Sequence, residues 1–279
     1  MPESSNPFLS RLCKSLGTDE GLAVYREIGR ELLPETPVSL PASWSEEVRS
    51  IMEKIVSGIE QGQPLQYLLG KAWFMGLEME VNPSVLIPRP ETEELVSLLL
   101  KTENQTGKKL LDLCTGSGCI ALAAQKLGNW QSVEALDVSE AALQTALRNR
   151  EKTRADGVSF FEFDLLNDVF SANRSWDVLV SNPPYVAASE SAAMDARVLE
   201  NEPHLALFVP DNDALCFYRR MLALSEKHLN PGGMIFLEIN PLFSDELLLL
   251  YRESGLFQSV EIQSDMSGKS RFLIAEKQG

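Results

Sequence analysis

Short apolar runs alternate with amphipathic stretches along the chain from residue 108 onward. The apolar runs predict strands at 109–114, 132–137, 158–163, 176–181 and 234–239, with a closing pair at 260–263 and 271–275. Helical spacing lies between them, at 120–127, 140–150, 214–228 and 244–254. This alternation predicts a largely parallel sheet with helices on both faces, which binds ligands at the carboxyl ends of its strands.

The first 70 residues show helical periodicity only. Helices are predicted near 7–16, ending at Gly17, and over 19–33, ending before Pro34. A third begins near Trp44, with Ser43 as its N-cap and Glu46 completing a capping box. We expect these helices to form a small N-terminal domain.

A loosely alternating stretch at 73–85 joins the two parts of the chain. Gly76 and Asn82-Pro83 are turn signals, so the stretch predicts a short hairpin. Pro90, followed by acidic residues, suits the first turn of a helix. The expected organisation is a helical domain over 1–70, a hairpin linker over 71–89 and an α/β domain over 90–279.

Composition narrows the class of protein. The 279 residues suggest about two domains, and 44% apolar residues are enough for a core. No apolar run is long enough to span a membrane and the chain opens without a signal-peptide pattern, so we expect a cytoplasmic protein. With four cysteines, two histidines and no C-x-x-C pair, no metal site is predicted. The formal net charge of −15 argues against nucleic acid as the main substrate.

A glycine-rich loop follows the first predicted strand of the α/β domain and opens a helix. Its spacing also fits the dinucleotide fingerprint G-x-G-x-x-G/A, so the loop alone leaves nicotinamide and S-adenosylmethionine cofactors open. An acid inside the strand, at Asp112, resembles the motif of class I methyltransferases, in which it orders the loop and the methionine end of the cofactor. The candidate cofactor residues of this segment are Asp112, Cys114, Thr115, Gly116, Ser117 and Gly118.

Two later strands end in acids that suit an adenosine. Asp137 can accept hydrogen bonds from both ribose hydroxyls. Asp164-Leu165 is at the position from which this fold commonly contacts the adenine, although a surface acid that starts a loop fits the sequence almost as well.

The most specific motif is Asn182-Pro183-Pro184-Tyr185, directly after the fourth strand. The Asn182 side-chain oxygen and the Pro183 carbonyl could accept both hydrogens of a substrate –NH₂ group. Two fixed acceptors would free the delocalised lone pair of a planar nitrogen and aim it at a methyl donor. Tyr185 can pack against the flat acceptor group. We therefore assign the catalytic and substrate-binding roles to Asn182, Pro183, Pro184 and Tyr185, and a cofactor contact to Asn182 as well.

Over nearly its whole length the chain resembles the PrmC/HemK family of protein-(glutamine-N5) methyltransferases. The matching motifs are Pro64–Gly70, Val85–Glu93, Asp112–Gly118, Asp137, Ser181–Tyr185, Glu202–Leu207 and Pro231–Gly233. The resemblance implies a Rossmann-like, class I methyltransferase fold with a seven-stranded sheet, and S-adenosyl-L-methionine as cofactor. It also implies that the substrate is the glutamine of the Gly-Gly-Gln motif in class 1 peptide chain release factors, gripped in part by the N-terminal domain.

Two positions depart from the family pattern. Cys114 stands where the family usually has Gly, so the loop is expected to be slightly wider there. Asn240 follows Glu238-Ile239 where the family has Gly, and Asn tolerates the left-handed backbone region better than most residues. Arg89 suits either a substrate or lid contact or a surface cation in the linker.

Three rival functions compete with this interpretation. An adenine-N6 methyltransferase of DNA or RNA would use the same Asn-Pro-Pro-Tyr chemistry, but the acidic charge argues against it. A nicotinamide oxidoreductase lacks a suitable His or Lys pair after residue 180. A non-enzymatic adaptor would not need intact cofactor and acceptor motifs.

Overall fold

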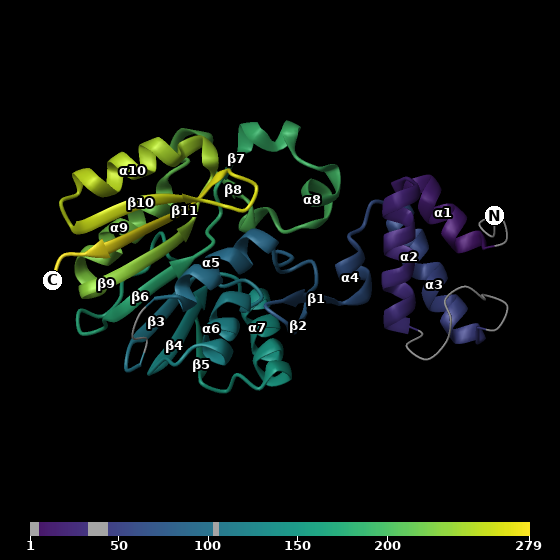
Figure 1. Ribbon diagram of the computed structural model, residues 1–279, viewed down its shortest axis with the longest axis horizontal. Helices are drawn as coiled ribbons and strands as arrows, with labels where there is room; N and C mark the ends of the chain where they lie inside the picture. Colours follow the sequence, from purple (N-terminus) through teal and green to yellow (C-terminus); the bar gives the residue numbers. More distant parts are fainter. Residues whose placement is uncertain (1–5, 33–43, 103–105) are drawn as a thin grey trace. The chain divides into compact units, whose positions relative to one another are not determined.

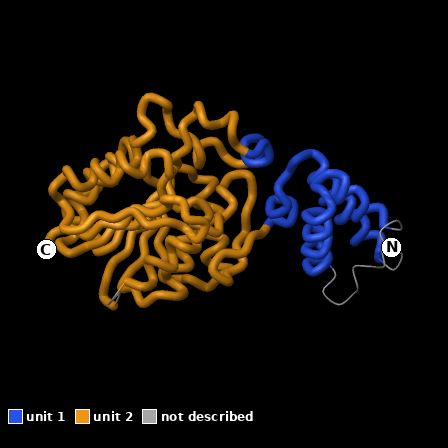
Figure 2. Tube along the Cα trace, turned by 45° about the horizontal axis from the view of Figure 1, so that its top comes forward, with its two compact units in different colours: residues 1–70, 195–201 blue, residues 71–194, 202–279 orange. Residues whose placement is uncertain are grey.

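The computed structural model describes residues 6–32, 44–102 and 106–279, and it divides into two compact units (Figure 2). The first unit comprises residues 1–70 together with 195–201, and the second comprises 71–194 and 202–279. The hairpin therefore belongs with the α/β unit. Residues 195–201, which the sequence assigned to the α/β domain, instead group with the N-terminal helices.

The first unit is helical. Its elements are α1 (Pro7–Leu16), α2 (Thr18–Leu32), α3 (Glu46–Glu60), α4 (Leu65–Leu69) and α8 (Ala196–Asn201). The Asn6 side chain caps α1 by accepting from the Phe8 and Leu9 amides, and Gly17 ends the helix with a φ of 87°. Leu12, Ile28, Met52 and Val56 are fully buried in a core that lies within this unit.

The start of α3 differs from the sequence prediction. Ser45 is its N-cap and accepts from the Val48 amide at 3.3 Å, whereas the predicted cap, Ser43, lies outside the described residues. The helix therefore starts at Glu46, which lies in its first turn.

The second unit is built on a seven-stranded sheet (Figure 1). Its strands are β3 (Lys109–Leu113), β4 (Ser132–Asp137), β5 (Val158–Glu162), β6 (Trp176–Ser181), β9 (Leu229–Glu238), β10 (Phe257–Ser264) and β11 (Ser270–Lys277). They lie in the order β10-β11-β9-β6-β3-β4-β5, and β11 runs opposite to the other six strands. This is the largely parallel sheet that the alternation of strands and helices predicts.

Helices cover both faces of the sheet because side chains alternate along each strand. On one face, Leu110, Val133 and Val178 pack with α5 (Pro90–Leu100) and α6 (Cys119–Leu127), next to α7 (Glu140–Thr153). On the other, Leu111 and Leu179 pack with α9 (Cys216–His228) and α10 (Ser244–Glu253).

The strand register brings three loop starts to one edge of the sheet. Leu113 pairs with Ser181, and Ser181 pairs with Leu237. The residues that follow this row are Cys114, Asn182 and Glu238, which therefore emerge side by side at the carboxyl edge. The order of strands reverses at β3 and β6, which is where ligands bind in open α/β sheets.

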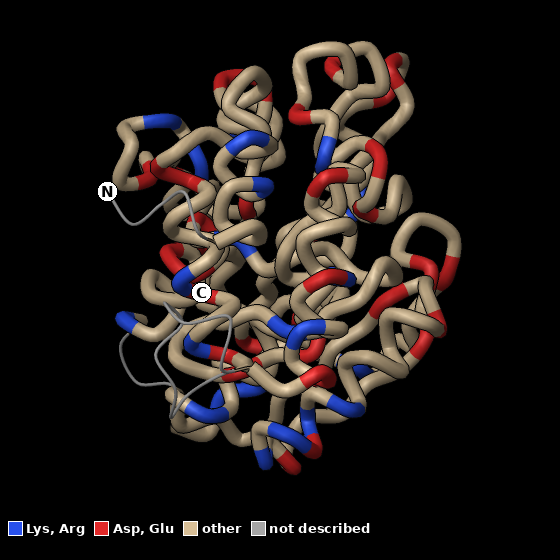
Figure 3. The backbone as a smooth tube through the Cα atoms, turned by 90° about the vertical axis from the view of Figure 1, so that its right-hand side faces the viewer, with Lys and Arg blue, Asp and Glu red and all other residues tan. Residues whose placement is uncertain are grey.

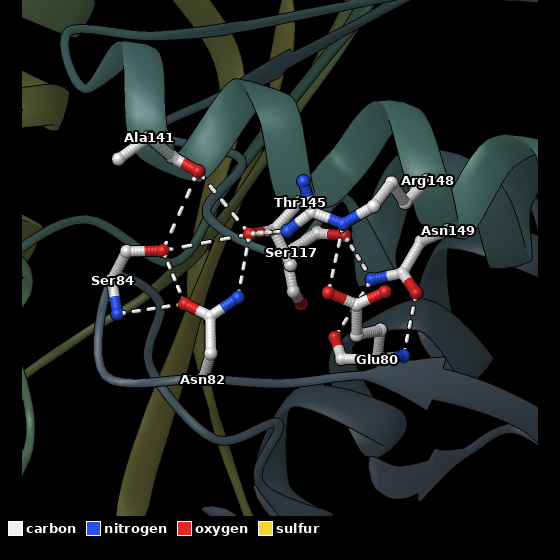
Figure 4. A network of polar contacts seen from close by, with 8 residues as sticks. All are labelled: Glu80, Asn82, Ser84, Ser117, Ala141, Thr145, Arg148 and Asn149. Atoms are coloured by element: carbon white, nitrogen blue, oxygen red, sulfur yellow. Dashed lines mark hydrogen bonds and ion pairs between the residues drawn. The ribbon is translucent and has the colours of Figure 1, made fainter. Parts of the chain in front are cut away.

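The hairpin of β1 (Lys71–Phe74) and β2 (Leu77–Glu80) turns at Met75 and Gly76, which both have positive φ. Figure 4 shows how β2 and the following residues dock on α7. The buried Asn149 amide accepts from the Glu80 amide at 2.5 Å and donates to the Glu80 and Ser117 carbonyls at 3.0 Å. Asn149 thereby joins the hairpin to the glycine-rich loop.

The segment between β6 and α9 contains short elements that the sequence did not predict. They are β7 (Val186–Ala187), α8, β8 (Phe208–Val209) and the 3₁₀ turns at Ala188–Ala193, His204–Ala206 and Asp211–Asp213; a further 3₁₀ turn, Pro241–Phe243, precedes α10. None of the helices in the described ranges is long and apolar enough to cross a membrane.

We predict that Asn149→Ala lowers the free energy of unfolding by about 2–3 kcal/mol, because buried backbone groups of the hairpin and the loop lose their partners. Arg148→Ala is the matched control, since it removes a half-exposed ion pair with Glu80 and a hydrogen bond to the Thr145 hydroxyl but leaves the backbone groups of the hairpin paired, and it should cost less than about 1 kcal/mol. Urea unfolding measures both. Equal losses would contradict this role of Asn149.

Candidate active site

A cavity of about 330 Å³ lies at the carboxyl edge of the large sheet. Linker residues 84–86, 88 and 89 contribute to its walls, together with residues at the carboxyl ends of β3, β4, β5 and β6. The predicted site residues that line it are Cys114, Thr115, Gly116, Ser117, Asp137, Asp164, Leu165, Asn182 and Pro184. The other four, Asp112, Gly118, Pro183 and Tyr185, are not among its lining residues.

The two glycines of the loop have different physical roles. At Gly116 the φ is 55°, and a Cβ would meet no atom within 4 Å, so the backbone leaves open space beside the cavity. At Gly118 the φ is 82°, and a Cβ would lie 3.1 Å from Ala146 and Phe160. Gly116 therefore permits close approach of a ligand, whereas Gly118 permits close packing of α6 against the sheet.

Cys114 adopts a φ of 61°, in the left-handed region that favours glycine. The presence of Cys instead of Gly at this position costs about 1–2 kcal/mol of backbone strain. Only a slightly wider loop was expected from the sequence. Burial raises the pKa of the Cys114 thiol well above its usual range, so the side chain is a neutral thiol.

Asp112 is fully buried beneath the loop. One carboxyl oxygen accepts from the Thr115 hydroxyl at 2.5 Å and from the Ala121 amide at 3.2 Å. The other has no hydrogen-bond partner among the described residues. Burial, followed in the same direction by the nearby Asp137 charge, raises the Asp112 pKa to about 7. The structure thus shows Asp112 ordering the loop from below rather than lining the cavity.

The two other predicted acids, Asp137 and Asp164, line the cavity and already accept hydrogen bonds from the protein. Asp137 accepts from the Gly116 and Ser139 amides, both at 2.9 Å, and burial raises its pKa. Asp164 accepts from the Asn167 side chain and the Leu166 amide, and the first of these bonds lowers its pKa. Asp164 is therefore both a turn former and a cavity residue. Each carboxylate oxygen has more than one lone pair, so both acids can still accept from a ligand.

The acceptor motif is held by a chain of buried hydrogen bonds. Asn182 Nδ2 donates to Thr92 Oγ1 at 3.0 Å, and Thr92 Oγ1 donates to Glu238 Oε2 at 2.8 Å. The Tyr185 hydroxyl donates to Glu238 Oε1 at 3.1 Å. Tyr185 therefore has a hydrogen-bonding role in addition to the packing role predicted from the sequence. Burial is the main cause that raises the Tyr185 pKa, so the hydroxyl stays protonated.

Asn240 supports the same motif from behind. Its φ is −72°, so the tolerance of Asn for the left-handed region is not needed at this position. The side chain donates to the Tyr185 carbonyl at 3.2 Å and to Glu190 at 3.0 Å, and accepts from the Leu242 amide. The departure from glycine therefore adds contacts to the acceptor loop.

Two other family motifs meet in this unit. Glu202 is buried and forms an ion pair with Arg89 at 2.6 Å while accepting from the Ile87 amide at 3.2 Å. Arg89 also lines the cavity, so it is neither a free surface cation nor an isolated linker residue. Glu202 fixes the linker against the cavity.

Sequence reasoning missed several residues of the site. Thr92, in the first turn of α5, and Glu238, at the end of β9, appeared in the sequence only as members of longer motifs, and no local signal shows that they meet. Val138, Phe163, Leu205 and Phe217 supply apolar walls that no motif indicates.

The cavity fits S-adenosylmethionine. The open space at Gly116 admits a ligand against the backbone, and the buried hydroxyl of Ser117, a residue of the cavity wall, has no hydrogen-bond partner among the described residues. Asp137 and Asp164 offer acceptors to an adenosine, while Phe163 and Leu165 offer apolar surface. The cavity thus offers partners for both the polar and the apolar parts of the cofactor.

Fold and site together define a class I methyltransferase. Residues 91–207 match the family model described as "Methyltransferase small domain". The methyltransferase from Pyrococcus furiosus shares the fold, with a TM-score of 0.52 at 21% identity over 85% of this chain and 100% of that one.

Sequence relatives narrow the family. The release factor glutamine methyltransferase of Bacteroides thetaiotaomicron is 44% identical over 81% of this chain and 80% of its own length. That of Flavobacterium psychrophilum is 40% identical over 79% and 78%. The chain belongs to the release factor glutamine methyltransferase family. It is a methyltransferase, and its methyl donor is S-adenosylmethionine.

The raised Asp112 pKa makes stability depend on pH. Its folded-state pKa of about 7 lies above the unfolded value of about 4, so ionising Asp112 costs stability progressively as pH rises between these values. We predict that the free energy of unfolding of Asp112→Asn rises relative to that of wild type as pH increases from about 4 to 7. Above about pH 7 the difference between the two proteins should stay constant. Urea unfolding at about pH 4.5, 6 and 8 measures the difference. A difference that does not change with pH would refute the assignment.

Proposed function

We propose that this protein methylates the side-chain amide nitrogen, N5, of the glutamine in the Gly-Gly-Gln motif of class 1 peptide chain release factors. The observation that carries the proposal is that one cavity is lined both by the glycine-rich loop and by Asn182 and Pro184 of the acceptor motif. A methyl donor on the loop and an acceptor nitrogen at Asn182 would therefore share one enclosed space.

The acceptor motif supplies the positioning that an amide nitrogen needs. S-adenosylmethionine, when bound, supplies a methyl group on a positively charged sulfonium. The Asn182 side-chain oxygen and the Pro183 carbonyl accept the two hydrogens of the glutamine –NH₂ group, which localises the nitrogen lone pair and orients it. No strong base is required before transfer, because the nitrogen becomes acidic once it is methylated. The absence of His and Cys from the acceptor motif agrees with this chemistry.

The release factor is proposed as partner on two grounds. The relatives that match four-fifths of the chain are named release factor glutamine methyltransferases. The helical first unit has a core of its own and is proposed to help grip the protein substrate. A cytoplasmic location, expected from the sequence, belongs to the same proposal.

Adenine-N6 methylation is the competing function, because the same acceptors serve an exocyclic amine. The formal charge of −15 disfavours binding to a phosphate backbone. In the described part of the chain, Lys and Arg are interleaved with Asp and Glu rather than gathered in one basic stretch (Figure 3).

The test is incubation of the protein with S-adenosylmethionine and a purified class 1 release factor, followed by tandem mass spectrometry of the Gly-Gly-Gln peptide. We expect one added methyl group on the glutamine. A release factor with that glutamine changed to alanine is the control, and duplex DNA is assayed in parallel. Methylation of adenine, with none of the release factor, would overturn the proposal.

We also predict that Asn182→Ala lowers kcat on the release factor by about 10²-fold or more, because one of the two amide acceptors is lost. Cofactor affinity, measured by calorimetry with S-adenosylhomocysteine, should largely persist. Turnover like that of wild type would rule out Asn182 as the amide acceptor.

A further inference from the structure

Asn182 can serve as an amide acceptor only if its side-chain oxygen, and not its nitrogen, faces the substrate. The two ends of an asparagine amide have nearly the same shape, so packing alone selects weakly between them. The hydrogen-bond partners behind Asn182 must therefore make the choice.

The buried chain behind Asn182 has only one consistent direction when Glu238 is a carboxylate. A carboxylate can only accept hydrogen bonds, so the single hydroxyl hydrogen of Thr92 must be donated to Glu238 Oε2, at 2.8 Å. The Thr92 oxygen can then only accept from Asn182, which must present Nδ2, at 3.0 Å. Asn182 Oδ1 is left over, and no residue in the described ranges donates a hydrogen bond to it.

We propose that Thr92 and Glu238 are positioning residues that fix the orientation of the Asn182 amide, so that its oxygen is available to the substrate amide. This inference rests on the proposed function. Thr92 is 2% exposed and Glu238 is 1% exposed, so water does not compete with either bond. The Tyr185 hydroxyl occupies the other Glu238 oxygen and holds the carboxylate in place.

Protonation of Glu238 would remove the constraint. A protonated carboxyl can donate to Thr92, which frees the Thr92 hydrogen to point at Asn182 and allows the amide to turn over. Tyr185 and Thr92 act on Glu238 through hydrogen bonds, and Arg271 and Glu91 act through their charges; the buried titratable groups Tyr218 of α9 and Cys119 of α6 also interact with its charge. The balance, with burial as the largest cause, raises the Glu238 pKa to about 7. The ionised form, and with it the productive orientation, is therefore gained as pH rises through neutrality.

The test compares methylation of the release factor by Thr92→Val, Thr92→Ser and wild type. Valine keeps the shape without the hydroxyl, so kcat should fall about 10- to 100-fold, while the affinity for S-adenosylhomocysteine stays within about twofold. Serine keeps the hydroxyl and should restore most of the activity. Ser97→Ala is the matched control on α5, because among the described residues the Ser97 hydroxyl bonds only to the Glu93 carbonyl of its own helix.

Glu238→Gln provides an independent arm that does not depend on the folding of Thr92→Val. The variant imitates the protonated acid, so its kcat should be low and should not rise between about pH 6 and 8, whereas that of wild type should rise. Equal kcat for Thr92→Val and wild type, loss of activity in Thr92→Ser as large as in Thr92→Val, or a wild-type pH profile in Glu238→Gln would overturn the proposal. Failure of the proposed function would appear differently, as absence of release factor methylation by wild type.

Discussion

The buried carboxylate of Glu238 is the interaction on which the acceptor site depends. It lies at the end of β9 and accepts from Thr92 on α5 and from Tyr185 in the acceptor motif, while the Tyr218 hydroxyl of α9 donates to its backbone carbonyl. Burying a charge costs free energy unless it is hydrogen-bonded. The hydrogen bonds of Glu238 offset this cost, and they connect elements from both faces of the sheet next to Asn182.

A second buried acid plays the equivalent part on the cofactor side. Asp112 ties Thr115 and the start of α6 to β3 and so shapes the glycine-rich loop. The pKa values of both acids are raised to about 7, with burial as the largest cause. Between them, the row of paired residues Leu113, Ser181 and Leu237 sets the spacing of the two loops. Cofactor loop and acceptor motif are thus supported by separate carboxylates on one rigid sheet.

Most of the sheet could be predicted from sequence because its strands are short apolar runs. The predicted bounds of β4 and β6 agree with the structure, and the other strands of the sheet differ by a few residues at their ends. The short elements between residues 186 and 213 were not predicted, because they are too brief to show periodicity. The N-cap of α3 was misplaced because two serines offer the same chemistry two residues apart.

The motifs of the candidate site could be located in the sequence, but the buried residues that hold those motifs in place could not. Loops after strands carry recognisable residues, so the glycine loop and the acceptor motif could be located directly. Thr92 and Glu238 are 146 residues apart, and only the fold shows that they meet. The contacts of Asn240 could not be predicted for the same reason, since its partners, Tyr185 and Glu190, are distant in sequence.

A crystal structure of the complex with S-adenosylhomocysteine and a release factor domain containing Gly-Gly-Gln would test the central claim most directly. The account predicts that the glutamine amide nitrogen lies within hydrogen-bond distance of Asn182 Oδ1 and the Pro183 carbonyl, with Asn182 Nδ2 still on Thr92. A glutamine bound through its carbonyl oxygen to Asn182 Nδ2, with Asn182 Oδ1 turned toward Thr92, would contradict it.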